Sequence, residues 1–289
     1  MDIRAILAGL GFALMWSSAF TSARIIVADA SPLAALTLRY LISGLLGVAI
    51  ARMLGQTWQL TPKQWRATIV FGVLQNAVYL GLNFVAMQTI EASVAAIIAS
   101  TMPLLVALAG WVFLGDNLKP LSVAGLVAGV IGVGLIMGAR ITGGVDLVGL
   151  MLCTIGVVAL TVATLAVRGA TSGGNFLMIV GLQMLVGCAA LALATALFET
   201  PRVTPSWPLA AAFAYTTLVP GLAATFVWFW LVNRIGATRA ATFHFLNPLF
   251  GVAIAALLLD ESLGLRDVLG VAIITVGILA VQLSRHAKP

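Results

Sequence analysis

The chain has 289 residues, of which 62% are hydrophobic and only 8% are charged. Soluble domains are about 45–50% apolar and about 25% charged. With 15 basic and 9 acidic side chains, the chain cannot cover the surface of a soluble fold of this size. The surplus of apolar side chains must face lipid. This excludes a cytosolic enzyme, a DNA-binding protein and a secreted disulfide-bonded domain.

The net charge of +6 does not indicate nucleic acid binding, because no run of Lys and Arg forms a phosphate-binding stripe. The basic residues stand singly between apolar segments instead. Cys153 and Cys188 both fall inside such segments, where a cysteine behaves as a small hydrophobic residue. We therefore expect no disulfide framework.

Mostly apolar segments, separated by short polar or Gly/Pro breaks, are interpreted as membrane-spanning helices, which need about 20 such residues each. We count ten, covering residues 3–27, 33–53, 66–87, 92–114, 121–137, 147–167, 176–198, 209–232, 237–259 and 268–283. Arg4 and the sequence Ala28-Asp29-Ala30 imitate a signal peptide with its cleavage site. We nevertheless expect the first segment to be retained, because it has a counterpart in the second half of the chain.

The loops predict the orientation through the positive-inside rule. With the N-terminus inside, ten Lys and Arg residues fall in cytoplasmic segments. The outer loops hold only Arg24, Arg140, Arg202 and Arg266, while Arg39 lies within a helix. Both termini are therefore expected in the cytoplasm.

The sequence is internally duplicated. A shift of 145 residues aligns 90–136 with 235–281 without a gap, and it matches Pro103 with Pro248 and Gly132 with Gly277. Residues 1–140 and 141–289 are then two repeats of five helices each. Because five is odd, the second repeat enters the membrane from the opposite side. Inverted repeats are typical of secondary transporters, whose substrate site lies at the midplane between the halves.

These motifs also resemble a known family. The first repeat contains Ser100-Thr101-Met102-Pro103-Leu104, Leu114-Gly115-Asp116, Gly125 and Gly132, and the second contains Phe245-Leu246-Asn247-Pro248-Leu249, Asp260-Glu261, Gly270 and Gly277. Pro32, Arg39 and Tyr40 complete the pattern, which resembles the EamA-type branch of the drug/metabolite transporter superfamily, although Asp116 stands where that family usually has Glu. Within this branch the chain is most similar to YddG-type exporters of aromatic amino acids.

The resemblance implies an all-α membrane protein, with ten transmembrane helices arranged as two inverted five-helix repeats around a central cavity. It further implies export across a bacterial inner membrane by alternating access, with no cofactor and no metal. The cavity would be formed chiefly by the third, fourth, eighth and ninth helices.

Pro103 and Pro248 each fall near the middle of a predicted helix. A proline there removes one backbone hydrogen bond and frees the carbonyl four residues earlier, which belongs to Ala99 or His244. The two kinks either face a water-lined cavity or only shape the packing, and the sequence favours neither.

His244 is the only titratable side chain near a helix midpoint apart from Arg39, and Asn247 shares its helix face. Because polar groups inside a membrane are costly, we favour a cavity role for His244 over a histidine satisfied by a neighbouring helix. It would bind a substrate carboxylate or amine, or take up a proton.

A polar stripe of Asn76, Tyr79 and Asn83 follows one face of the third helix and either joins helices or lines a wet path. The 145-residue shift pairs Asn83 with Trp228, and tyrosine, tryptophan and amide groups together suit a planar amphipathic solute. The same shift places Trp16 opposite Thr161. The predicted substrate-binding residues are Trp16, Asn76, Tyr79, Asn83, Ser100, Thr161, Trp228, His244 and Asn247.

Arg39 lies six residues after Leu33 in the second helix. We expect it to snorkel to the outer surface rather than to attract a carboxylate. No Asp or Glu falls at mid-membrane, so facilitated diffusion is as compatible with the sequence as proton antiport. Asp116 and Glu261 are expected at helix ends, as gates or caps.

Other classes of function find less support. The chain has no HExxH, GxSxG or P-loop motif for a membrane enzyme, and no charged ring for a channel. We therefore expect a non-enzymatic exporter of aromatic amino acids and similar small metabolites, with other small amines, nucleobases or toxic compounds as the alternative. Its expected partners are a small-molecule substrate and the lipid bilayer, without nucleic acid, and we expect a monomer.

Overall fold

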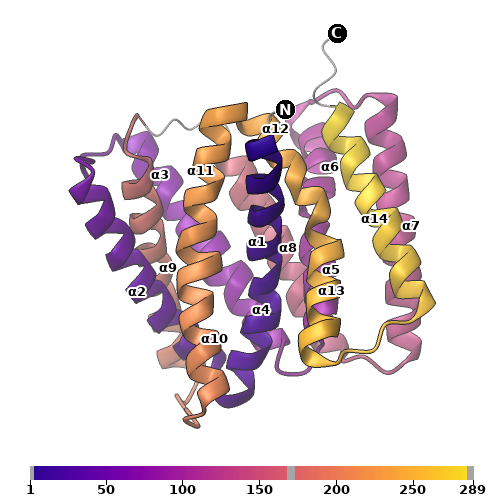
Figure 1. The fold of residues 1–289 in the computed structure, drawn as a ribbon, viewed down its shortest axis with the longest axis horizontal. Helices are drawn as coiled ribbons and strands as arrows, with labels where there is room; N and C mark the ends of the chain where they lie inside the picture. The colour runs from indigo at the N-terminus through magenta and orange to yellow at the C-terminus, as the bar shows by residue number, and fades with distance from the viewer. Residues whose placement is uncertain (1–2, 168–172, 285–289) are drawn as a thin grey trace.

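The computed structural model describes residues 3–167 and 173–284 (Figure 1). Over these ranges the chain is helical, and its β pairing is limited to an isolated bridge between Ala30 and Val203. Ten helices are long and apolar enough to cross a membrane. The predicted all-α membrane fold with ten spans is therefore confirmed.

The elements, in chain order, are α1 (Ile3–Asp29), α2 (Pro32–Met53), α3 (Pro62–Phe71), η1 (Gly72–Tyr79), α4 (Leu80–Ala86), α5 (Ala92–Ser100), α6 (Met102–Leu114), α7 (Pro120–Thr142), α8 (Leu147–Ala166), α9 (Phe176–Phe198), α10 (Trp207–Leu218), η2 (Val219–Ala223), α11 (Ala224–Ile235), α12 (Ala237–Thr242), η3 (Phe243–Leu246), α13 (Asn247–Leu259) and α14 (Leu265–Ser284). Several spans are therefore built from two or three consecutive elements.

Some helix ends differ from the prediction, because capping residues extend the helices beyond their apolar stretches. The third span begins at Pro62 rather than at residue 66, since Thr61 and Gln64 form a reciprocal capping box. The eighth begins at Trp207, where the Ser206 hydroxyl accepts the N–H of Leu209.

Four spans are interrupted, and the interruptions recur in both repeats. The third and eighth spans contain the π-helical segments η1 and η2, which overlap under the 145-residue shift. The fourth span breaks at Thr101 between α5 and α6, and the ninth breaks at η3 between α12 and α13. Pro103 and Pro248 each occupy the first turn of the helix after the break, where the missing N–H costs little. The predicted kinks are thus helix interruptions.

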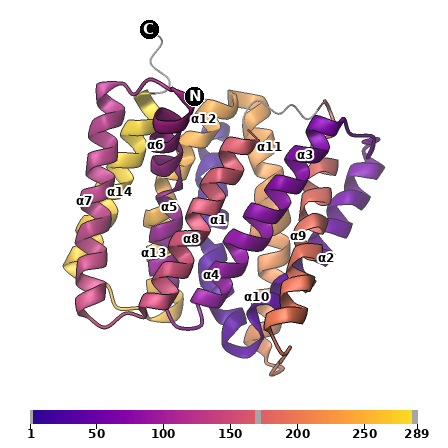
Figure 2. The same cartoon turned by 180° about the vertical axis from the view of Figure 1, so that it is seen from behind.

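The two repeats interlock. Helices α2 and α9 pair at one edge of the molecule, and α7 pairs with α14 at the opposite edge (Figures 1 and 2). Each pair joins a helix to its own counterpart in the other repeat. Between these edges, α1 packs against α13 and α10, while α8 packs against α5 and α4. The region between the edges therefore contains elements of both repeats.

We call the end of the bundle where α1 begins the N-terminal end, and the opposite one the far end. Charged side chains join the repeats at the far end. The carboxylate of Glu199 accepts the N–H groups of Leu33 and Ala34 at 3.1 and 2.8 Å. Glu261 accepts those of Ala92 and Ser93 at 2.7 and 3.0 Å, so its predicted position as a helix cap is confirmed. 

A three-residue ion network lies at the same end. The guanidinium of Arg140 pairs with Glu91 at 2.5 Å and with Asp267 at 3.2 Å. Because Arg140 belongs to the first repeat and Asp267 to the second, the network adds a further link between the halves. The far end is thus held together by contacts from both repeats.

Candidate functional site

Two adjoining cavities lie in the centre of the bundle. The deep cavity has a volume of about 240 Å³ and reaches toward the far end, where Arg39, Tyr40 and Met87 line it. The wide cavity, of about 730 Å³, extends toward the N-terminal end, as far as Gln64 and Val232. Residues lining both are Trp16, Phe20, Phe71, Gln75, Tyr79, Phe176, Val180, Gln183, Trp228 and His244. The two cavities therefore adjoin each other and share much of their wall.

An aromatic cage surrounds His244 where the cavities meet. The ring of Phe12 lies edge-on to the imidazole with centroids 5.2 Å apart, and that of Trp16 lies edge-on at 6.1 Å. The indole of Trp228 lies 5.3 Å away. We define Phe12, Trp16, Trp228 and His244 as the aromatic cage. It places three large apolar rings and one polar ring on the cavity wall.

Asn247 fixes the orientation of the imidazole. Its amide nitrogen lies 2.9 Å from Nδ1 of His244. Because an amide nitrogen only donates, Nδ1 accepts, and a neutral imidazole then carries its proton on Nε2. Asn247 also lines the wide cavity. The predicted pairing of these two residues on one face is therefore present, across the interruption formed by η3.

The polar stripe of the third span both lines the deep cavity and joins helices. The buried amide of Asn76 accepts the hydroxyl of Tyr40 at 3.3 Å and donates to the Gln183 carbonyl at 2.9 Å. Asn83 donates to the carbonyl of Tyr79 at 2.8 Å. Most of the hydrogen-bonding capacity of Asn76 thus positions neighbouring helices, while the Tyr79 side chain contacts both cavities.

Not all predicted site residues lie together. Ser100 lines the wide cavity beside Pro103, although its hydroxyl donates to the Ala96 carbonyl at 2.6 Å. Thr161 lies outside the linings of both cavities, and its hydroxyl donates to its own helix. Its helix presents Leu160 and Thr164 to the wide cavity instead, because the rotation of α8 about its axis is set by packing. The predicted juxtaposition of Trp16 and Thr161 is therefore not found.

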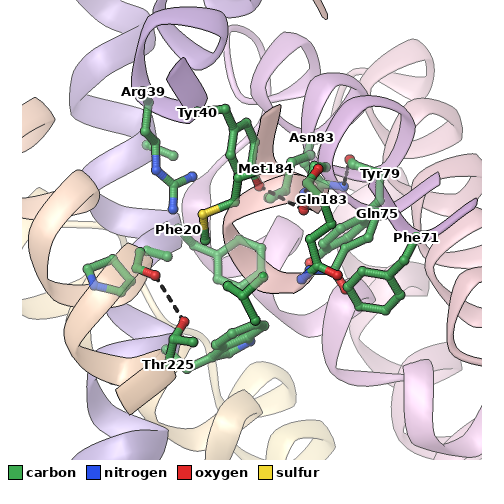
Figure 3. A pocket seen from close by; sticks show the side chains of 18 of the residues that line it. Phe20, Arg39, Tyr40, Phe71, Gln75, Tyr79, Asn83, Gln183, Met184 and Thr225 are labelled. Carbon is green, nitrogen blue, oxygen red and sulfur yellow. Dashed lines mark hydrogen bonds between the residues drawn. The ribbon is translucent and has the colours of Figure 1, made fainter. Parts of the chain in front are cut away.

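Other lining residues did not stand out in the sequence. Figure 3 shows Phe20, Phe71, Gln183 and Met184 around the deep cavity. Gln183 could have been identified as a cavity residue, because it is a single amide within an otherwise apolar segment. The phenylalanines could not, since apolar residues are common throughout the chain.

Arg39 does not snorkel. The residue is only 7% exposed, and its side chain lines the deep cavity (Figure 3). The snorkelling prediction was therefore wrong, because this face of α2 is covered by protein and borders the cavity. No Asp or Glu is found among the described residues lining either cavity.

Comparison with known proteins adds a family match. The sequence matches the EamA-like transporter family twice, over residues 3–138 and 147–283. It is 25% identical over 279 residues to "Uncharacterized transporter YvbV" of Bacillus subtilis, covering 95% of this chain and 90% of that protein. It is also 25% identical over 272 residues to "Protein PecM" of Dickeya dadantii, covering 91% and 86%. A solved crystal structure with 22% identity covers the whole of both chains at a TM-score of 0.70, which shows a shared fold.

Proposed function

Because the chain belongs to the EamA-like transporter family, we propose that it exports aromatic amino acids and similar small metabolites across a bacterial inner membrane. The family match identifies a multi-pass membrane transporter, and it points to transport rather than enzymatic chemistry. The substrate class, the direction and the membrane are our inference. They rest on the cavity and on the distribution of basic residues.

The aromatic cage carries the substrate assignment. Phe12, Trp16 and Trp228 offer ring faces and edges with which a planar aromatic solute stacks favourably. The same rings attract an ammonium group through cation–π interactions. Gln75 and Gln183 line both cavities and supply amide groups beside the rings. An amphipathic solute with a ring and polar groups suits such a wall.

The distribution of cavity and contacts supports alternating access. The cavity widens toward the N-terminal end, whereas Glu199, Glu261 and Arg140 join the repeats at the far end. With both termini in the cytoplasm, as the basic residues favour, this arrangement is an inward-facing state. Export then requires the far end to separate while the N-terminal end closes around the substrate.

Energy coupling in our proposal does not depend on an intramembrane carboxylate. Such groups are common in proton relays of pumps and transporters. The described linings contain His244 and no Asp or Glu, so facilitated diffusion needs no additional group. Proton exchange would use His244, and dependence of transport on a pH gradient distinguishes the two forms of coupling.

The proposal is tested by uptake into proteoliposomes that contain the purified protein. Labelled tryptophan, phenylalanine, threonine and a nucleobase are compared without a pH gradient and then with one. We expect saturable uptake of the two aromatic amino acids, and a large reduction by Trp228→Ala. Trp207→Ala is the control, because this tryptophan is 82% exposed and outside the cavity linings. Uptake of only the nucleobase or threonine would overturn the substrate assignment.

A further inference from the structure

Arg39 is the only Lys, Arg, Asp or Glu among the described residues that line the two cavities. It is the eighth residue of α2, about 10 Å along the helix from the far end. The residue is 7% exposed, and its Nε is buried without a hydrogen-bond partner. The deep cavity therefore contains one positive charge that pairs with no carboxylate of residues 3–167 or 173–284.

Within the described part of the chain, no acidic side chain forms an ion pair with the guanidinium of Arg39. Its aromatic contact is the ring of Tyr40, whose centroid lies 5.2 Å from Cζ. Ser43, one helical turn further along α2, also has a buried hydroxyl without a partner. Both groups face Gly221 in the π-helical segment η2, where a Cβ atom would lie 3.5 Å from Ser43 Oγ and 3.6 Å from Arg39 Nη2. The two groups without partners therefore lie beside the same glycine.

The fold itself does not require an arginine at this position. The 145-residue shift pairs Arg39 with Met184, which lines the same deep cavity from α9. The second repeat therefore builds an equivalent helix with an apolar side chain at the equivalent place. Because a buried charge without a partner is costly, its presence in only one repeat calls for a compensating ligand.

We propose that Arg39 is a carboxylate-binding subsite, and that the transported solutes are those with a single carboxylate and an apolar, preferably aromatic, body. A guanidinium presents parallel N–H donors that match the two oxygens of a carboxylate. One positive charge balances one carboxylate, and burial strengthens their attraction because little water screens it.

This inference rests on the proposed function and gives the substrate a direction in the cavity. The carboxylate lies toward the far end at Arg39, while the ring lies in the aromatic cage around His244, nearer the N-terminal end. A solute that lacks the carboxylate leaves the arginine unpaired. The cavity is therefore expected to reject aromatic amines and amides that otherwise fit the cage.

Competition binding with the purified full-length protein tests this. Unlabelled competitors are tested for their ability to displace labelled tryptophan. Indole-3-propionate keeps the carboxylate and lacks the amine, whereas tryptamine and tryptophan amide lack the carboxylate. On the unmodified protein we expect the affinity of indole-3-propionate to be about 10-fold or more higher than that of tryptamine, because hydrogen bonds to charged groups contribute this much. This comparison requires no variant, so it does not depend on how a substitution folds.

Three variants locate the effect. Arg39→Gln is expected to weaken tryptophan binding about 10-fold or more and to bring the affinities of tryptophan and tryptamine together. Arg39→Lys keeps the positive charge but loses the parallel N–H donors of the guanidinium. It is expected to retain part of the preference for tryptophan over tryptamine. Arg202→Gln, an exposed arginine near the far end, controls for the loss of any positive charge and is expected to keep the full preference.

The outcomes separate the two proposals. Equal competition by tryptamine and indole-3-propionate, with unchanged tryptophan binding by Arg39→Gln, would overturn the subsite and leave the aromatic substrate in place. Binding of labelled leucine but not of tryptophan, lost in Arg39→Gln, would support the subsite and overturn the aromatic assignment. If no carboxylate in the panel binds the unmodified protein, both proposals are wrong.

Discussion

Gly125 and Gly277 bring the backbones of α7 and α14 into direct contact. A Cβ atom on Gly277 would lie 2.7 Å from the carbonyl oxygen of Gly125, and one on Gly125 would lie 2.5 Å from that of Gly277. Gly132 and Gly270 repeat this reciprocal relationship two helical turns away. Small residues allow such close approach of membrane helices. These glycines therefore pack the fifth span against the tenth within one chain.

This contact predicts that Gly277→Ala destabilises the protein, since a methyl group has no room between the helices. Overpacking of this kind costs about 1–3 kcal/mol. The measurement is thermal unfolding of the purified protein in detergent. Gly134→Ala is the matched control in α7, because a Cβ there meets no atom within 4 Å. Equal melting temperatures for the two variants would contradict the close packing.

A second prediction concerns the cap that Glu261 provides for α5. Glu261→Ala leaves the N–H groups of Ala92 and Ser93 without their acceptor. The expected loss of stability is about 1 kcal/mol, the usual effect of removing a helix cap. Glu261→Gln keeps one acceptor oxygen and is expected to lose less. Thermal unfolding of both variants measures the difference, and an Ala variant as stable as the Gln variant would argue against capping.

The carboxyl of Asp146 predicts a pH effect at the start of α8. The hydroxyl of Thr89, 2.6 Å away, and the N–H of Gly149 hold the pKa of this carboxyl below its usual range. A lowered pKa in the folded state contributes stability above the unfolded pKa and loses it as pH falls through the folded one. The melting temperature of the unmodified protein should therefore fall further on acidification below about pH 4 than that of Asp146→Asn. Parallel pH profiles would contradict this prediction.

A fourth prediction tests the orientation of His244. Asn247→Ala removes the donor to Nδ1 and lets the imidazole rotate within the cage. One such hydrogen bond is worth about 0.5–1.5 kcal/mol, so tryptophan affinity is expected to fall about 2- to 10-fold. Thr275→Val is the control, because its hydroxyl donates only to its own helix in α14. Binding as tight as that of the control would show that Asn247 does not position the ring.

The sequence was sufficient for the architecture because its signals there are long and repeated. Ten apolar segments and a 145-residue repeat with matched prolines and glycines define spans and symmetry without any knowledge of packing. Trp16 and Trp228 were also identified as cavity residues, since their depth in a span distinguishes them from tryptophans at span ends. His244 was identified because it is an ionisable side chain near a helix midpoint. The capping box at Thr61 was present in the sequence, but it lies outside the apolar stretch used to place the third span.

The sequence could not predict which side chains face the cavities, because this depends on the orientation of each helix about its axis. Tertiary packing sets that orientation. Thr161 faces away from the cavities while Leu160 and Thr164 face the wide one. Arg39 was expected at the surface because hydropathy alone cannot tell a lipid-facing side of α2 from a cavity-facing one. The π-helical segments likewise arise from local backbone geometry that no residue pattern in this chain specified in advance.

Counterflow tests the central claim most directly. Proteoliposomes containing the purified protein are loaded with unlabelled tryptophan and diluted into a trace of labelled tryptophan, without a pH gradient. A carrier with an aromatic site exchanges the two, so the account predicts a transient accumulation of label inside, reproduced with phenylalanine and absent from protein-free liposomes. No accumulation with either amino acid, by protein that remains folded and monodisperse, would contradict the account.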